Sequence, residues 1–214
     1  MLLNETFMLS QQISKLRKAG ADILCSKILQ ELKDLGMLNA SLAFEFLETI
    51  FKQENLLSDG MDVIDLKFSA NLGEPVKSLK EIISGGEMSR LMLAFKTVVA
   101  SVDDMPTMIF DEIDTGISGK MAQAVARKMA VISNEHQVLA ITHSSQIASM
   151  GDNVYLIFKL IENGKTTSKI KLLNREEKLS EVAKFLSGDH TSSSAIQNAS
   201  DLISEQEVFK QNLK

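Results

Sequence analysis

The chain has 214 residues, 44% of them hydrophobic, so it can form one large domain or two small ones with a buried core. Its 23 basic and 28 acidic residues give a net charge of −5, which excludes a polycation that binds nucleic acid through bulk charge. No apolar stretch approaches the roughly 18–20 residues of a membrane span, and the N-terminus lacks the features of a signal peptide. Together with a single cysteine, these features lead us to expect a cytoplasmic protein without membrane contact.

Residues 1–35 are predicted to form one helix, because they contain no proline and a single glycine. Apolar residues recur along it every seven positions, at Leu2, Leu9, Leu16 and Ile23. The companion series of a coiled-coil seam has only one apolar member in four, so a coiled coil and an ordinary amphipathic helix both remain open. A second stripe at Leu24, Ile28, Leu32 and Leu35 predicts packing against a globular core before Gly36 ends the helix.

The rest of the chain alternates predicted strands and helices. The predicted elements are strands between 41 and 70, a loop at 71–75, a helix at 87–102, a strand at 107–110, a helix at 119–134, a strand at 138–142, a hairpin of 154–160 with 166–173 around Asn163-Gly164, and helices at 176–187 and about 192–210. The strands at 107–110 and 138–142 are wholly or mostly apolar, as strands buried on both faces are. This order predicts an α/β fold with a mostly parallel sheet flanked by helices.

The first candidate motif is Ser84-Gly85-Gly86-Glu87, at the start of the predicted helix. Two glycines allow close approach of a ligand to the backbone, and a helix N-terminus presents free N–H groups to a phosphate. A serine–glycine helix cap without any ligand explains the same residues equally well.

The second motif is an acidic pair, Asp111-Glu112, directly after the apolar strand at 107–110. Ligands of open α/β sheets bind at the carboxyl ends of strands, where Asp111 is placed to hold Mg²⁺ and Glu112 to deprotonate an attacking water. The third is His143, after the next predicted strand, where its ring can reach a phosphoryl group. A solvated strand end and an ordinary structural histidine are the alternatives, and we assign His136 and His190 to the latter class.

The order and spacing of the three motifs resemble the C-terminal lobe of an ABC-type ATPase head. In that family residues 84–87 correspond to the signature motif, 107–112 to the Walker B strand and His143 to the switch histidine. The segment 111–119, DEIDTGISG, resembles SMC-type heads and, in its continuation, the RecN family of DNA repair proteins. Similar RecN-like segments occur at 70–77, 83–96, 137–148 and 182–188. Ser118 stands where transporter ATPases carry an aspartate, which argues against a transporter.

A P-loop, G-x-x-x-x-G-K-[ST], occurs nowhere in the chain. In SMC-like proteins the P-loop lies in an N-terminal lobe that a long antiparallel coiled coil joins to the C-terminal lobe. The resemblance therefore implies the C-terminal part of a RecN-type protein, with residues 1–35 as the end of a returning coiled-coil arm and 36–214 as the head lobe. Whether this is a truncation or a split gene product is left open.

The resemblance implies Mg²⁺-dependent ATP hydrolysis in recombinational repair of DNA double-strand breaks. Asp111 would hold Mg²⁺, Glu112 would activate water, His143 would sense the γ-phosphate, and residues 84–87 would bind ATP held by a second head. The implied partners are a P-loop-bearing N-terminal lobe, a second head in a homodimer, and DNA. We expect negligible ATPase activity from this chain alone, because these groups act only when positioned together.

Two alternative hypotheses for the function remain open: the chain is part of another SMC-like head, or it is a truncated non-catalytic partner of a full-length head. For DNA, the best local candidate is the segment 159–184, whose seven basic and four acidic residues give +3. A solvated hairpin and helix face explains that segment at least as well.

Overall fold

The computed structural model describes residues 2–47, 57–81, 85–102, 105–162, 165–188 and 192–213. The chain forms two compact units, Met1–Asp103 and Asp104–Lys214. The division of the sequence at residue 35 into an arm and a head lobe concerns a longer protein and remains a prediction.

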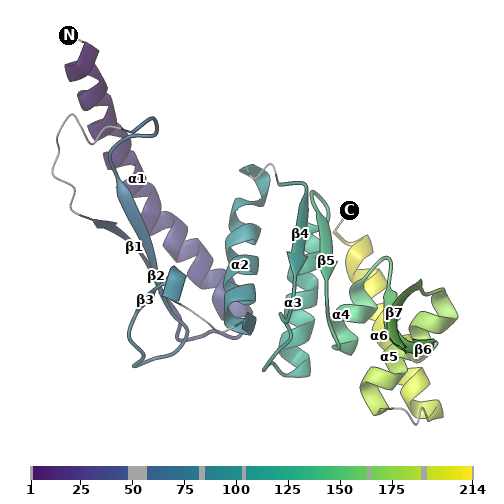
Figure 1. Ribbon diagram of the computed structural model, residues 1–214. Helices are drawn as coiled ribbons and strands as arrows, with labels where there is room; N and C mark the ends of the chain where they lie inside the picture. Colours follow the sequence, from purple (N-terminus) through teal and green to yellow (C-terminus); the bar gives the residue numbers. More distant parts are fainter. Residues whose placement is uncertain are drawn as a thin grey trace. The chain divides into compact units, whose positions relative to one another are not determined.

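The first unit combines the long helix α1 (Leu2–Asp34) with an antiparallel sheet and the helix α2 (Gly85–Val99) (Figure 1). The sheet has the order β1 (Ser41–Leu47), β2 (Val63–Ser69) and β3 (Lys77–Ser78), with Ser41 opposite Ser69 and Leu47 opposite Val63. Short 3-10 turns, η2 (Leu79–Glu81) and η3 (Ala100–Val102), flank α2.

The two ends of α1 differ in burial, as the sequence predicts. Ile28, Leu32 and Leu35 are buried where α1 packs against α2 and β1, and Gly36, with φ of +81°, ends the helix. The seven-residue series Leu2, Leu9, Leu16 and Ile23 is exposed throughout. The apolar packing of the helix therefore lies in its C-terminal third, and an apolar stripe stays open along the rest.

A polar cluster ties the middle of α1 to the turn before β2. The Ser14 hydroxyl donates to Asp62 Oδ1 at 2.6 Å, and Arg17 donates to Asp62 Oδ2 at 3.0 Å. Arg17 also donates to the Asp59 carbonyl at 2.8 Å, beside Gly60, whose φ is +114°. The predicted Asp59-Gly60 turn is confirmed, and its side-chain contacts fix its position on the helix.

The second unit is built on the parallel pair β4 (Thr107–Phe110) and β5 (Gln137–Ala140), connected by α3 (Gly119–Ile132). The short helix α4 (Ser145–Met150) follows, then the antiparallel hairpin β6 (Tyr155–Glu162) and β7 (Lys165–Leu172). The hairpin strands are confirmed, whereas the predicted Asn163-Gly164 turn lies outside the described residues. The sequence predicts a mostly parallel sheet, but within the described residues parallel pairing is confined to β4 and β5.

The predicted two-sided burial of the first parallel strand is wrong, and the expected burial of the second is also not observed. Met108 and Phe110 are buried, but Ile109 between them is 68% exposed. Leu139, which pairs with Ile109, is exposed, and so is Ile141 just beyond β5. Strand residues alternate between faces, so β4 is covered on the face that carries Met108 and Phe110 and open on the face that carries Ile109.

Helices α5 (Arg175–Ser187) and α6 (Ser193–Gln211) pack on each other and on α4. Four alanines in their shared core let the helices approach closely; the core consists of Ala148, Val182, Ala183, Ala195, Ala199 and Ile203. A capping box starts α5, in which Asn174 accepts from the Glu177 N–H and the Glu177 side chain accepts from the Asn174 N–H. No helix of the described residues is both long enough and apolar enough to cross a membrane.

Ile203 provides a test of this core. Replacing Ile203, which is 6% exposed, by alanine should lower the free energy of unfolding by about 2–5 kcal/mol in urea titrations, because it leaves a cavity among α4, α5 and α6. The matched change Ile196→Ala on the same helix, where the side chain is 43% exposed, should cost less than about 1 kcal/mol. Equal losses in the two variants would contradict this packing.

Candidate functional site

The parallel register of β4 and β5 brings two of the predicted motifs together. Thr107 pairs with Gln137 and Phe110 with Ala140, so both strands end at the same edge. The Ile141 N–H donates to the Phe110 carbonyl at 2.9 Å and extends the pairing by one step. Asp111 follows the first strand and His143 lies three residues after the second, so the two strands that precede these residues are direct neighbours in the sheet.

The acidic pair lies in a tight turn directly after β4. Asp111 and Glu112 are both exposed, whereas Ile113 is completely buried and anchors the turn in the core. The turn is closed by the Thr115 N–H, which donates to the Glu112 carbonyl at 3.0 Å. Glu112 has a φ of +55°, a left-handed conformation that costs a non-glycine residue free energy.

A second aspartate, Asp114, connects this turn to the residues that follow β5. One of its oxygens, Oδ2, accepts a hydrogen bond from the Thr142 hydroxyl at 2.6 Å and another from the His143 backbone N–H at 3.1 Å. The Asp114 side chain is 3% exposed, whereas that of His143 is 81% exposed, with Nδ1 lying 3.7 Å from Oδ2. Our reading of the sequence missed Asp114, because an aspartate in a turn carries no pattern that distinguishes it from a solvated one.

The Ser84–Glu87 motif lies at the start of α2, in the first unit. Gly85 is the first residue of the helix and is exposed, Gly86 is buried, and Glu87 is half-buried. Ser84 itself lies outside the described residues. The placement of the glycines in the first turn agrees with the predicted helix N-terminus, while the binding role of the motif remains a prediction.

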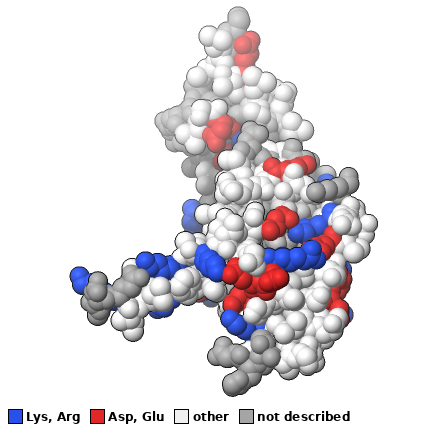
Figure 2. Space-filling view, turned by 90° about the vertical axis from the view of Figure 1, so that its right-hand side faces the viewer, with Lys and Arg blue, Asp and Glu red and all other residues white. Residues whose placement is uncertain are grey.

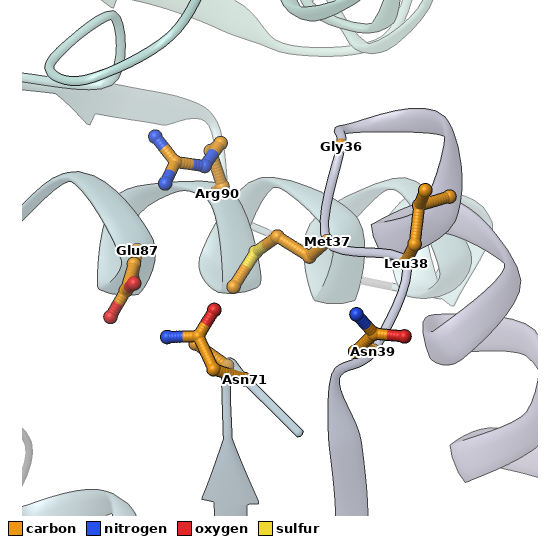
Figure 3. Close-up of a pocket in the computed structure, with 8 residues that line it drawn as sticks. Gly36, Met37, Leu38, Asn39, Asn71, Glu87 and Arg90 are labelled. Carbon is orange, nitrogen blue, oxygen red and sulfur yellow. The ribbon is translucent and has the colours of Figure 1, made fainter. Parts of the chain in front are cut away.

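A polar pocket of about 200 Å³ adjoins the first turns of α2. Figure 3 shows Glu87 and Arg90 projecting from α2, close to the loop that follows α1 and to Asn71. Arg90 is a buried cation: burial lowers the pKa of its guanidinium, and the negative charge of Glu87 opposes that shift. The pocket lining consists of Gly36, Met37, Leu38, Asn39, Ala70, Asn71, Glu87 and Arg90.

The structure therefore gathers Asp111, Glu112 and His143 at one strand edge of the second unit, while residues 85–87 belong to the first unit. The exposed carboxylate of Asp111 suits Mg²⁺, which prefers few protein carboxylates and keeps water or phosphate oxygens as its other ligands. Among the described residues there is no group of three or more histidine, cysteine or acidic side chains that could hold a metal ion. The role of Asp111 as a Mg²⁺ ligand remains a prediction.

The remaining candidate residues have ordinary surroundings. His136 is buried, with Nδ1 2.7 Å from the Met105 carbonyl, as expected of a structural histidine, and His190 lies outside the described residues. In the basic segment 159–184, Lys171 pairs with Glu177 and Arg175 with Glu207. Basic and acidic side chains are interspersed over the middle of the face shown in Figure 2.

Known proteins of one family match most of this sequence. The DNA repair protein RecN of Bacillus subtilis (strain 168) is 37% identical over 209 residues, which cover 92% of this chain and 36% of that protein. RecN of Deinococcus radiodurans is 37% identical over 199 residues, covering 93% of this chain and 34% of that protein. The chain belongs to the RecN family. It spans about a third of the length of the RecN relatives it matches.

A solved SMC structure shares the fold of this RecN-family chain. The Smc head domain with a coiled coil and joint from Pyrococcus yayanosii superimposes with a TM-score of 0.53 at 20% identity, covering 79% of this chain and 30% of that one. No protein-family model matches the sequence. The fold is therefore that of part of an SMC-type head.

The left-handed conformation of Glu112 generates a stability prediction. Glu112→Gly should be more stable than Glu112→Ala by about 1 kcal/mol, because glycine adopts positive φ without the clash that any Cβ introduces. Both variants remove the same carboxylate, so the difference between them in urea unfolding isolates the backbone conformation. Equal stability of the two variants would contradict a left-handed residue 112.

Proposed function

We propose that this chain is the C-terminal ATPase-head portion of a RecN protein that acts in recombinational repair of DNA double-strand breaks. Completed by a P-loop-bearing N-terminal lobe, it would hydrolyse ATP with Mg²⁺. The observation that carries the proposal is the convergence of Asp111, Glu112 and His143 at the carboxyl ends of β4 and β5, in a chain that belongs to the RecN family.

Each of these side chains has a distinct role in the proposed reaction. Asp111 would supply a carboxylate ligand to Mg²⁺, which when bound neutralises charge on the phosphate oxygens. Glu112 would accept the proton of the attacking water, and its exposure leaves room for that water. The exposed ring of His143 would contact the γ-phosphate from the neighbouring strand.

The requirement for a second lobe is supported by open apolar surface as well as by the absence of a P-loop sequence. Ile109 and Leu139 lie side by side on the open face of the parallel pair, and Ile141 continues that face. On the β6–β7 hairpin, Ile157 pairs with Ile170, and both are exposed. Apolar faces of this kind mark surfaces that another folded element covers, and the P-loop-bearing lobe is the element that the proposed reaction lacks.

The Ser84–Glu87 motif would serve the nucleotide of a second head. Gly85 is exposed at the N-terminus of α2, where unpaired N–H groups can receive a phosphate from across an interface. The proposed assembly is therefore a homodimer of heads with ATP between them. DNA contact and a location in the cytoplasm with the nucleoid follow from the RecN relatives alone, since no charge pattern in this chain specifies them.

Complementation tests the proposed ATPase. The chain alone should show no measurable ATP turnover, and adding a P-loop-bearing N-terminal lobe should produce Mg²⁺-dependent phosphate release. Glu112→Gln should reduce that turnover by at least about a hundredfold and leave ATP-driven association intact, because it removes the base but keeps the Asp111 and phosphate contacts.

Glu135→Gln, the same change at an exposed residue in the turn after α3, serves as the control and should leave turnover unchanged. Turnover by the chain alone would contradict the proposal that the site is incomplete. If the chain associates with the lobe but no combination of the two hydrolyses ATP, the chain is instead a non-catalytic partner of a full-length head.

A bulky residue at position 84 tests the signature motif. We predict that position 84 faces a second head rather than the core, so Ser84→Arg should leave the unfolding midpoint of the chain nearly unchanged but should abolish ATP-dependent pairing of heads by occupying the phosphate position. Analytical ultracentrifugation of the complemented head with and without ATP measures the pairing. If pairing persists, or if the chain unfolds, the motif is a structural helix cap.

A further inference from the structure

Asp114 is a buried carboxylate between the two motifs at the strand edge. It lies in the turn that carries Asp111 and Glu112, and its partners, Thr142 and His143, follow β5. Both of its described hydrogen bonds reach the same oxygen, Oδ2. The Thr142 hydroxyl in turn accepts from the Ser144 N–H at 2.9 Å, so the bonds form a short chain into the start of α4.

The other oxygen of Asp114, Oδ1, is buried and has no hydrogen-bond partner among the described residues. A buried carboxylate oxygen without a donor is costly, because it has lost its water and gained nothing in exchange. An ion-pair contact connects this carboxylate to His143. The ring nitrogen Nδ1 lies 3.7 Å from Oδ2, just beyond hydrogen-bond distance. A small rotation of the exposed ring would bring an Nδ1–H into contact with the carboxylate.

We propose that Asp114 is a positioning residue that orients His143: its carboxylate accepts the Nδ1–H of the ring and so turns Nε2 outward. This inference rests on the proposed function, because an outward Nε2 matters only where a phosphate lies beyond it. Asp114 acts through His143 and touches no reacting atom. A carboxylate that binds one ring nitrogen fixes both the tautomer and the orientation of the imidazole.

The arrangement also links Glu112 to His143. Asp114 is two residues after Glu112 in a turn held by the buried Ile113 and by the Thr115–Glu112 hydrogen bond. Because these hydrogen bonds connect the two segments, a displacement of the residues after β5 would also displace the turn that holds the acidic pair. One buried carboxylate thus sets the positions of the proposed base and the proposed phosphate sensor relative to each other.

Imidazole nitrogen spectra of the 214-residue chain test this inference directly. Long-range ¹H–¹⁵N correlation at about pH 8, where an ordinary histidine is neutral, distinguishes the Nδ1–H from the Nε2–H tautomer. The His143 signal is assigned by its loss in His143→Gln. We expect the Nδ1–H tautomer to predominate at His143, opposite to the usual preference of a free histidine side chain for Nε2–H.

Asp114→Asn should reduce the ratio of Nδ1–H to Nε2–H at His143 at least fivefold, because a neutral amide oxygen is a weaker acceptor. Thr142→Val removes a competing donor to the same carboxylate and should keep the Nδ1–H tautomer. Asp152→Asn, the same change at an exposed aspartate of the second unit, is the control and should leave the His143 spectrum unchanged. If Asp114→Asn does not fold, the wild-type and Thr142→Val spectra still decide the tautomer.

An Nε2–H tautomer in the wild-type chain, or a spectrum that Asp114→Asn does not change, overturns the positioning role. In the head completed with a P-loop lobe, Asp114→Asn should lower kcat at least tenfold with less than a threefold change in the KM for ATP. If Glu112→Gln abolishes turnover while the His143 tautomer ignores Asp114, the inference fails and the proposed function stands. If the tautomer responds to Asp114 but the completed head hydrolyses no ATP, the proposed function fails and the positioning role stands.

Discussion

The parallel pairing of β4 with β5 is the constraint on which the candidate site depends. Parallel neighbours need a crossover connection, which α3 provides. In the observed register the two strands begin and end together. That geometry places Asp111 and His143 at one edge although about 30 residues separate them in the chain. An antiparallel pairing of the same two strands would put the acidic pair and the histidine at opposite ends of the sheet.

The turn after β4 combines tight anchoring with local strain. Ile113 is fully buried and Asp114 is nearly so. Glu112, which precedes them, is exposed and has a left-handed backbone conformation. A glycine would fit position 112 with less strain, so stability does not explain the glutamate there. A strained, exposed carboxylate held by buried neighbours is a common arrangement where a side chain must face a ligand.

Several apolar strand residues of the second unit are exposed in this chain. Continuous apolar sequence at 107–110 is typical of strands covered on both sides, yet Ile109 faces outward here. Ile157 and Ile170 on the hairpin are exposed as well. Their composition suits a larger structure, in agreement with a chain that spans about a third of the RecN proteins it matches.

The sequence by itself predicted most of the element order and the helix ends to within a few residues, although not the short helix α4 or the strand β3, and it singled out the three motifs as candidates. Those features depend on local periodicity, on Gly36 as a helix stop and on residue types at short spacing, which a single chain displays directly. Only the tertiary structure decided which strand faces are covered, that the motifs divide between two units, and that Asp114 joins the turn after β4 to Thr142 and His143. Burial and hydrogen bonding between residues 28 or 29 positions apart arise from packing, and no local pattern in the sequence encodes them.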